Sequence, residues 1–440
     1  MRRVIIASLA AAVSLAVPAA ATAASGWSKP AILLPPGKLA YQPAIATAAN
    51  STTVVVWDAY DSKKNKYSLM AATRTPAGKI AIRKLGPAVS ALAKPALAVG
   101  GDGTFAVAWE YPGKNGGSDV LAVRIMPHGA KAFGATMKVS SANLSTDYGA
   151  GDAPSITVDD AGTVYVAWEG NYSGGGGKHS QVVESQRAKS AGSWSAPVRL
   201  SAPGTDSHGA RIAADGKGNA AISWAETNSS VWASLTAGGR FGPAKEIAGA
   251  TYGSTPPSIA IADSGKASIL WEQSGKDNTH LIAGKVTTPR LFPAKSQFVS
   301  GKALSRYQAL ALSSSGGGVA AWEEEIAGGW EIDAASLSGS SWSSGTRVMP
   351  TGYAATFGIP PVVAANNQRA VVGWSERDLH RASFVGVRVR VGKSWQKAVN
   401  FPGLSAPVIA VPNDPVKSGP VAGAMVWLST KGLQISILKP

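Results

Sequence analysis

The sequence predicts an all-β protein, an eight-bladed β-propeller of four-stranded antiparallel blades. Three observations predict it. A phrase ending on tryptophan recurs eight times, as in GGDGTFAVAWE, DDAGTVYVAWE and ADSGKASILWE. The recurrence interval of about 50 residues is the size of one blade. The chain also begins with a strand of the kind that its last repeat lacks. A seven-bladed ring with one degenerate repeat is the alternative.

The first two strands of each repeat form a hairpin. Glycine allows the turn, and proline often opens the first strand, where its missing N–H costs no ladder bond. The second strand ends on a tryptophan, and these are Trp57, Trp109, Trp168, Trp224, Trp271, Trp322, Trp374 and Trp427. We expect each ring to pack as an apolar plate against the next blade, with ligand stacking as the alternative.

The third and fourth strands follow each tryptophan. The third reads YSLMAATR or FVGVRVR, and an aromatic residue such as Phe241 or Trp395 announces the fourth. The last repeat stops after the third strand, GLQISILK, whereas the segment SGWSKPAILL around Trp27 is a fourth strand without a hairpin before it. The N-terminal strand is therefore expected to complete the last blade and remove the free sheet edges.

The beginning of the chain, MRRVIIASLAAAVSLAVPAAATAASG, has two arginines, an apolar run and small residues, as a secretory signal peptide does. We expect a signal peptide at 1–24, a single propeller domain at 25–440, and no transmembrane segment. The mature protein is expected to be a monomer, secreted or located in the periplasm or at the cell surface. The chain has no cysteine, so core packing and ring closure must stabilise it.

The formal charge is +16. Outside a cell this favours anionic polymers such as acidic polysaccharides, while a dispersed solubilising charge is the alternative. No Lys/Arg run indicates specific nucleic-acid binding. The sequence also lacks metal-ligand spacing, a Gly-x-Ser-x-Gly elbow and a phosphate loop, so we expect no metal, no cofactor and no identifiable catalytic residue.

The repeated Gly-to-Trp phrase in a secreted chain resembles the sialidase-like (BNR/Asp-box-like) propellers, and the resemblance covers the mature chain. It concerns architecture, because tryptophan follows glycine by six residues here and by three in an Asp-box. The resemblance implies three arginines, a Tyr/Glu nucleophile pair and an acidic Asp at the ring centre. That set cannot be placed on this sequence.

Most tyrosines lie in loops that open on one rim of the ring, before the first strand or after the second. They are Tyr41, Tyr60, Tyr111, Tyr148, Tyr172, Tyr252, Tyr307 and Tyr353. Tyrosine suits contacts with sugar rings and peptides, and core capping is the alternative. Arg306 and His208 are further ligand-binding candidates on this rim.

Carboxylates follow the tryptophans on the same rim. They are Asp58, Glu110, Glu169, Glu226, Glu272, Glu323 and Glu376. A residue repeated in every blade most often serves the blade, so we expect these carboxylates to accept N–H groups of the following loop. Binding of a cation or a basic partner is the alternative.

These features favour a non-catalytic exported propeller that binds a glycan or an extracellular protein through the tyrosine-rich rim, and the positive charge favours an anionic partner. One alternative is a polysaccharide-active enzyme, either a sialidase-like glycosidase or a lyase, that uses His208, Tyr307, Arg306 and some of the rim carboxylates. A structural scaffold is the other alternative.

Overall fold

The computed structural model describes most of residues 26–440. The excluded positions are 36–38, 89–93, 112–119, 141–144, 147–153, 174–177, 228, 238, 250, 252–254, 275–279, 288–291, 293–295, 302, 379, 406 and 413–420. The expected signal peptide at 1–24 lies outside the described residues.

The described residues form eight separate antiparallel sheets, and these are the blades of an eight-bladed propeller. Blades 1 to 3 consist of β2 (Leu39–Thr47), β3 (Thr53–Asp61), β4 (Lys66–Arg74) and β5 (Ile80–Ala88); β6 (Ala96–Val99), β7 (Phe105–Tyr111), β8 (Val120–Met126) and β9 (Met137–Lys138); and β10 (Ser145–Thr146), β11 (Ser155–Val158), β12 (Val164–Ser173), β13 (Lys178–Arg187) and β14 (Val198–Arg199). Blades 4 and 5 consist of β15 (Ser207–Ala214), β16 (Ala220–Glu226), β17 (Ser230–Ala237), β18 (Arg240–Phe241) and β19 (Lys245–Ala248); and β20 (Ser258–Ile261), β21 (Ala267–Ser274), β22 (His280–Val286) and β23 (Gln297–Phe298).

Blades 6 to 8 complete the ring. They consist of β24 (Ser305–Leu312), β25 (Gly318–Ile326), β26 (Gly329–Ser338), β27 (Ser341–Trp342) and β28 (Thr346–Arg347); β29 (Tyr353–Ala355), β30 (Val362–Ala365), β31 (Arg369–Asp378), β32 (Ser383–Val391), β33 (Ser394–Trp395) and β34 (Val399–Pro402); and β35 (Val408–Ala410), β36 (Gly423–Ser429), β37 (Gly432–Leu438) and β1 (Ala31–Leu34). Some blades have more than four strand segments. In these blades two segments pair with the same neighbouring strand, so they are two pieces of one first or last strand. The prediction of eight four-stranded blades is confirmed.

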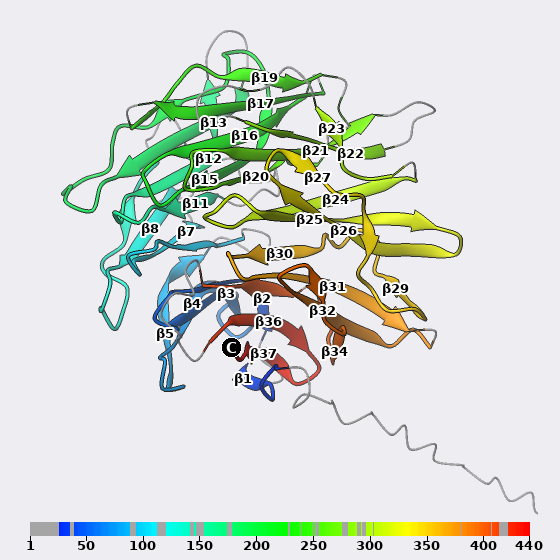
Figure 1. Cartoon of the computed structure of the whole chain (residues 1–440). Helices are drawn as coiled ribbons and strands as arrows, with labels where there is room; N and C mark the ends of the chain where they lie inside the picture. The colour runs from blue at the N-terminus through cyan, green and yellow to red at the C-terminus, as the bar shows by residue number, and fades with distance from the viewer. Residues whose placement is uncertain are drawn as a thin grey trace, which may run out of the picture.

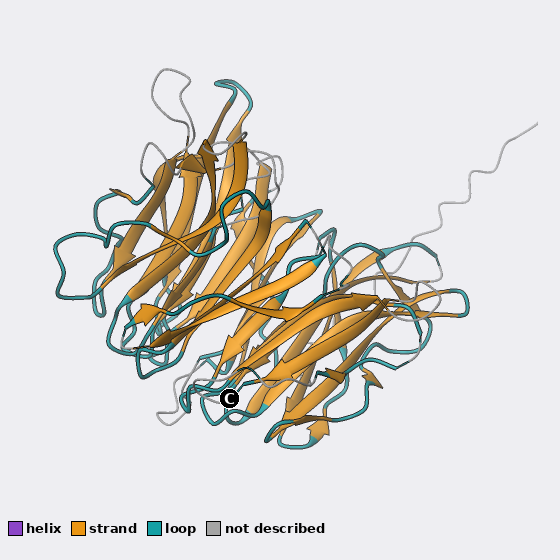
Figure 2. Ribbon diagram, turned by 90° about the horizontal axis from the view of Figure 1, so that it is seen from above, coloured by secondary structure: helices purple, strands orange, loops and turns teal. Residues whose placement is uncertain are grey.

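The blades follow one another around the ring in chain order. In Figure 1 the first strands, among them β2, β11, β20 and β30, lie towards the centre, and the last strands, such as β5, β19 and β34, lie outside. Figure 2 shows strands joined by loops throughout the described part of the chain. No helix that could cross a membrane is found among the described residues.

The two chain ends share the last blade. Strand β1 pairs antiparallel with β37, with Ala31 opposite Ile435 and Ile32 opposite Gln434. The blue β1 and the red β37 accordingly lie side by side in Figure 1. The N–H of Lys439 donates to the carbonyl of Gly26 at 2.9 Å. The predicted closure by the N-terminal strand is confirmed.

The eight repeat tryptophans are each at most 1% exposed and belong to the core between blades. Each ring packs against the preceding blade. Trp109 lies among Val54, Val56 and Leu69 of blade 1, and its indole N–H donates to the Pro87 carbonyl at 2.9 Å. Our expectation that the rings face the next blade is wrong. The period of two fixes which residues share a face but does not say which neighbour that face meets.

Candidate functional site

Three of the carboxylates that directly follow the tryptophans connect their blade to the next one. Consecutive side chains of a strand point to opposite faces, so a residue next to a backward-facing tryptophan faces forward. The side chains of Glu169, Glu272 and Glu323 accept backbone N–H groups from the following blade at 2.7, 2.8 and 3.4 Å. The donors are, in order, Gly209, Tyr307 and Gly358. The expected acceptor role is found in these three, although the donors lie at the start of the next blade. It is not found in Asp58, whose two carboxylate oxygens are buried and have no hydrogen-bond partner among the described residues.

The second residue after the tryptophan again faces backward and binds the indole. Glu324 and Glu376 accept the N–H of Trp322 and Trp374, each at 2.6 Å. Burial raises the pKa of Glu376 to about 7, although the indole hydrogen bond opposes the shift. Glu376 is therefore held inside the contact between blades, where a polymer outside the ring does not reach it, whereas Glu324 is half-buried.

Two of the predicted rim tyrosines form an aromatic group in blade 1. Tyr60 lies 4.8 Å from Tyr67, and Tyr41 lies 6.2 Å from the same ring, both measured between centroids. The Tyr60 hydroxyl donates to Asn65 at 2.8 Å. The rings of this group stabilise one another, and sequence reasoning did not single out Tyr67 as a member.

A second aromatic group lies where blades 6 and 7 meet. Tyr307 is 6.2 Å from Phe357, and Phe357 is 4.9 Å from Trp330. Phe357 is 52% exposed, which makes this group an open surface. Arg306 precedes Tyr307 and pairs with Glu323 across the ladder, where its charge opposes the rise in the pKa of Glu323 caused by burial.

The remaining rim candidates are dispersed. Tyr353 packs on Phe384 at 6.0 Å in blade 7, and Tyr111 is half-buried at the end of β7. Tyr148 and Tyr252 lie outside the described residues, and Tyr172 is described in backbone only. The structure therefore distributes the rim tyrosines over several blades.

The three residues proposed for an enzyme do not converge either. His208 belongs to β15 of blade 4, whereas Arg306 and Tyr307 belong to β24 of blade 6, with blade 5 between them. None of the three lines either of the two cavities described below. The structure therefore does not bring these three residues together in a common site.

A histidine–carboxylate pair lies on this rim where blades 3 and 4 meet. Nδ1 of His179, near the start of β13, is 3.2 Å from Oδ1 of Asp206, in the segment that leads into β15. The same oxygen accepts the backbone N–H of Ser180 at 3.0 Å. The side chains of His179 and Asp206 are 25% and 49% exposed. The pair is fixed on the protein side and open to solvent.

The surroundings of the pair hold it in place. Glu169 accepts the Gly209 N–H and lies 3.5 Å from the hydroxyl of Ser180, so it connects both strands. Gly209 has φ +68° at a bulge of β15, directly after His208. A Cβ at this glycine would lie 2.6 Å from the side chain of Pro256, so only glycine fits.

This geometry suits proton transfer. An ionised Asp206 favours the tautomer in which Nδ1 carries the proton and Nε2 keeps its lone pair. A histidine oriented through one nitrogen by a carboxylate and accessible at the other is a typical general base. His208 lies on the neighbouring strand β15. Sequence reasoning missed His179. Its position after the second strand of a repeat was the available signal, because the connections that follow second strands were expected to open on this rim.

The described residues line two cavities. One, of about 430 Å³, is the central channel, whose wall is formed by first-strand residues such as Ile45, Leu97 and Ile261. Asp160 and Asp263 lie at its end, and burial together with neighbouring carboxylates raises the pKa of Asp160. No group of three or more potential metal-ligating side chains occurs among the described residues. The other cavity lies between blades 7 and 8.

Comparison with known proteins gives structural likeness only. No family model matches the sequence, and no curated protein matches it. A PL25 ulvan lyase bound to -[GlcA(1-4)Rha3S]- has 10% identity and a TM-score of 0.51, covering 93% of this chain and 96% of that one. The polysaccharide lyase Uly1 has 10% identity, a TM-score of 0.45 and coverage of 91% and 90%. An α-L-arabinanase from Penicillium chrysogenum, complexed with arabinobiose, has 12% identity, a TM-score of 0.39 and coverage of 81% and 99%.

The comparison supports the propeller architecture inferred from the sequence, while no family match supports the Asp-box resemblance itself. It contradicts our expectation of a non-catalytic binding propeller. A solved structure that matches 93% of this chain is a polysaccharide lyase, and the enzyme alternative agrees with it better. Tyrosines and positive charge suit binding and catalysis equally, so composition could not separate the two functions.

Proposed function

We propose that the protein is an exported polysaccharide lyase that cleaves an acidic polysaccharide at the rim where blades 3 and 4 meet. The observation that carries the proposal is the His179–Asp206 pair, at 3.2 Å and open to solvent. The apolar run in the first 24 residues supports export. The likeness to a PL25 ulvan lyase supports the choice of polysaccharide chemistry.

Elimination fits the available groups better than hydrolysis. A glycosidase needs two carboxyl groups that flank the glycosidic bond. The rim carboxylates Glu169, Glu272 and Glu323 are at most 7% exposed and already accept backbone N–H groups. The accessible pair instead offers an imidazole, a side chain that can remove a proton beside a carboxylate.

The reaction can be written for a uronate unit. Nε2 of His179 removes the proton from the carbon that bears the carboxylate. The electron pair forms a carbon–carbon double bond as the bond to the glycosidic oxygen breaks, and that oxygen takes up a proton. A positive charge must stabilise the uronate carboxylate during this step. His208 and Arg211, both on β15, are the nearest candidates in sequence.

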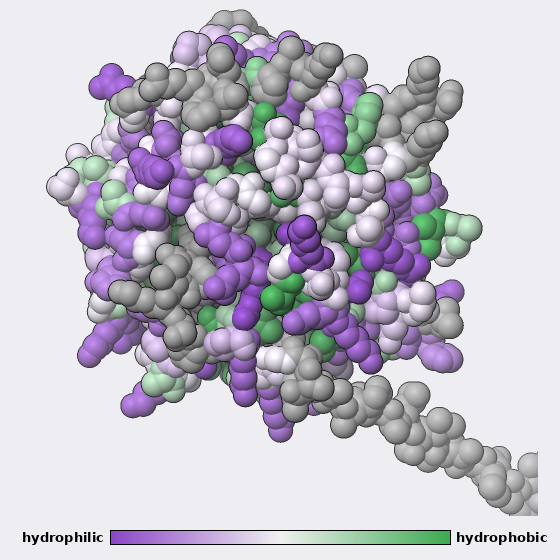
Figure 3. Space-filling view, in the orientation of Figure 1, coloured by the Kyte–Doolittle hydropathy of each residue, from purple (hydrophilic) through white to green (hydrophobic). Residues whose placement is uncertain are grey.

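The surface of the molecule suits the binding of a polar, anionic polymer. The formal charge is +16, which attracts polyanions at low ionic strength. On the face drawn in Figure 3, hydrophilic residues predominate and hydrophobic ones form small separate patches. Ring contacts with sugar could come from Phe357 and Trp330 on the same rim.

The test is incubation of the mature protein with uronate-containing and neutral polysaccharides. We expect new reducing ends together with the ultraviolet absorbance of an unsaturated uronate, from acidic polymers only. His179→Ala should lower the rate by about 100-fold or more, the range for loss of a general base. Asp206→Asn should lower kcat with little change in KM. His380→Ala, an exposed histidine in blade 7, is the matched control.

Two results would reject this function. One is the absence of cleavage of any acidic polymer, and the other is a His179→Ala rate equal to that of the wild type. Reducing ends without the ultraviolet product would indicate hydrolysis and would contradict the elimination step.

A further inference from the structure

A cavity of about 450 Å³ lies at the seam where the ring closes, between blades 7 and 8. Its wall comes from β31, β32, β34 and the ends of the described chain at Gly26 and Lys439. The cavity lies beside Val391 and Leu438, the last residues of β32 and β37, whereas His179 lies near the start of the equivalent strand β13. The seam cavity is therefore on the opposite face from the His179–Asp206 pair.

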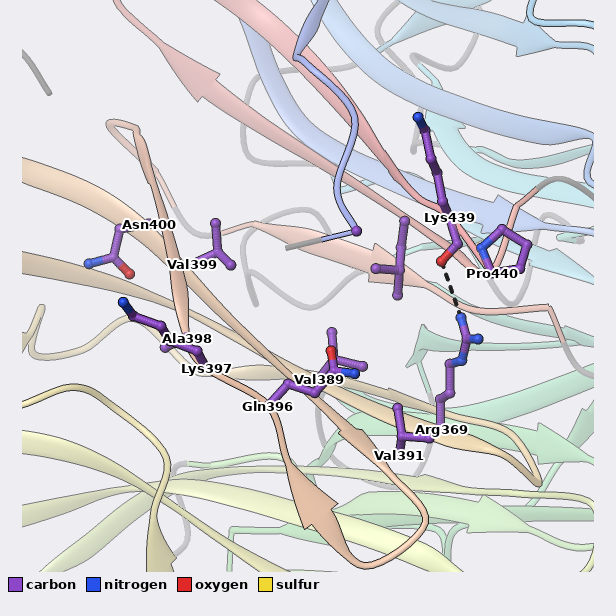
Figure 4. Close-up of a pocket in the computed structure, with 12 residues that line it drawn as sticks. Arg369, Val389, Val391, Gln396, Lys397, Ala398, Val399, Asn400, Lys439 and Pro440 are labelled. Atoms are coloured by element: carbon purple, nitrogen blue, oxygen red, sulfur yellow. Dashed lines mark hydrogen bonds between the residues drawn. The ribbon is translucent and has the colours of Figure 1, made fainter. Parts of the chain in front are cut away.

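The lining is cationic. It includes Arg369, Lys397 and Lys439, and no Asp or Glu side chain. Figure 4 shows Arg369 reaching across the seam, where its guanidinium donates to the Lys439 carbonyl at 3.4 Å. The remaining guanidinium donors and the two exposed ammonium groups can hold an anion.

The rest of the lining suits a sugar ring. Val389, Val391 and Val399 supply an aliphatic surface, and Asn400 lies on the same side as Lys397 in Figure 4. Oδ1 of Asn400 is buried and accepts no hydrogen bond from the described residues. A hydroxyl donor would satisfy this oxygen, which otherwise retains the cost of its desolvation. The volume lies within the range of small-ligand sites.

We propose that the seam cavity is a second, non-catalytic site that binds one acidic sugar unit of a polysaccharide through Arg369, Lys397 and Lys439. The choice of a saccharide rests on the proposed function, whereas the preference for an anion rests on the lining alone. The molecule then holds the polymer on one face and cleaves it on the other. Linking two sites in this way raises the apparent affinity for long chains over short ones.

The test measures binding of an oligogalacturonate, and of its neutral methyl ester, to His179→Ala protein by calorimetry. We expect Lys397→Ala/Lys439→Ala to weaken oligogalacturonate binding about tenfold at the seam site, because the double variant removes two exposed charges that face the anion. Val391→Trp should obstruct the cavity without any change of charge and should abolish that site. The methyl ester should not bind there in any variant.

The matched control is Lys131→Ala/Lys138→Ala, which removes two exposed charges from blade 2. An equal loss in this control, or unchanged binding in Val391→Trp, would show non-specific attraction and would overturn the proposal. Because the assay needs no turnover, it reports on the seam even if no polysaccharide is cleaved. Conversely, normal cleavage by the seam variants would leave the proposed function intact.

Discussion

Where a repeated phrase ends on a tryptophan and a carboxylate, the two side chains point towards opposite neighbouring blades. Trp271 packs on Val231 and Ile247 of blade 4, while Glu272 accepts the N–H of Tyr307 in blade 6. Strand alternation makes this outcome unavoidable once one of the two residues is placed. The sequence predicted both residue types and the acceptor role, but the neighbour that each residue meets depends on how the sheets stack.

The buried carboxylates should make stability depend on pH. Glu376 is 0% exposed, and its pKa rises from 4.5 to about 7 in the folded chain. Between these values the folded state keeps a proton that the unfolded state has released, so the free energy of unfolding falls as pH rises. The fall is on the order of 1 kcal/mol for each pH unit between the two pKa values, and it is complete above about pH 7.

Glu376→Gln keeps an acceptor for the Trp374 indole and removes the titration. Chemical denaturation should therefore show that the free energy of unfolding of the variant, relative to that of the wild type, is higher at pH 8 than at pH 5. Equal differences at both pH values would contradict burial as the cause of the raised pKa.

At the scale of single strands, the first strand of a blade often begins with a bulge in the left-handed region. Gln42, Gly209 and Tyr307 occupy the same place, with φ values of 47°, 68° and 56°. The bulge turns the N–H of Gly209 towards Glu169, and that of Tyr307 towards Glu272. Propensity predicted the strands and turns, whereas this backbone conformation depends on contacts with the preceding blade.

Gly209→Ala should destabilise the fold by at least about 1 kcal/mol and lower the cleavage rate, because the added methyl group meets Pro256 and the left-handed backbone disfavours alanine. The matched control is Gly192→Ala, where a Cβ meets nothing within 4 Å. Thermal unfolding of both variants tests this point. A Gly209→Ala protein as stable as Gly192→Ala would show that the bulge can relax.

The candidate site depends on a contact between blades that sequence patterns could not predict. Asp206 and His179 are 27 positions apart and belong to different blades. Only the packing of blade 3 on blade 4 brings them together. Sequence reasoning selected His208, which follows Asp206 closely in the chain, but it did not select His179.

For the whole molecule, no disulfide reinforces the ring, because the chain has no cysteine, so the two chain ends are joined by strand pairing and core packing. The sequence predicted the closing strand from one missing element, and β1 fills that place. Leu33 of β1 is 4% exposed in the core between blades 8 and 1, while its neighbour Ile32 is 51% exposed.

Leu33→Ala should lower the free energy of unfolding by about 2–5 kcal/mol, the usual cost of emptying a buried leucine site. Ile32→Ala, in the same strand, should cost much less because its side chain is already largely in water. Denaturant titration of both variants measures the difference. Equal losses would mean that β1 is not anchored through the core.

The most direct measurement of the central claim is a crystal structure of His179→Ala protein with an acidic oligosaccharide. We predict a uronate unit over blades 3 and 4, with its carboxylate-bearing carbon next to the position of the missing imidazole and Asp206 in place. An oligosaccharide bound only at other parts of the molecule, with this rim empty, would contradict the account.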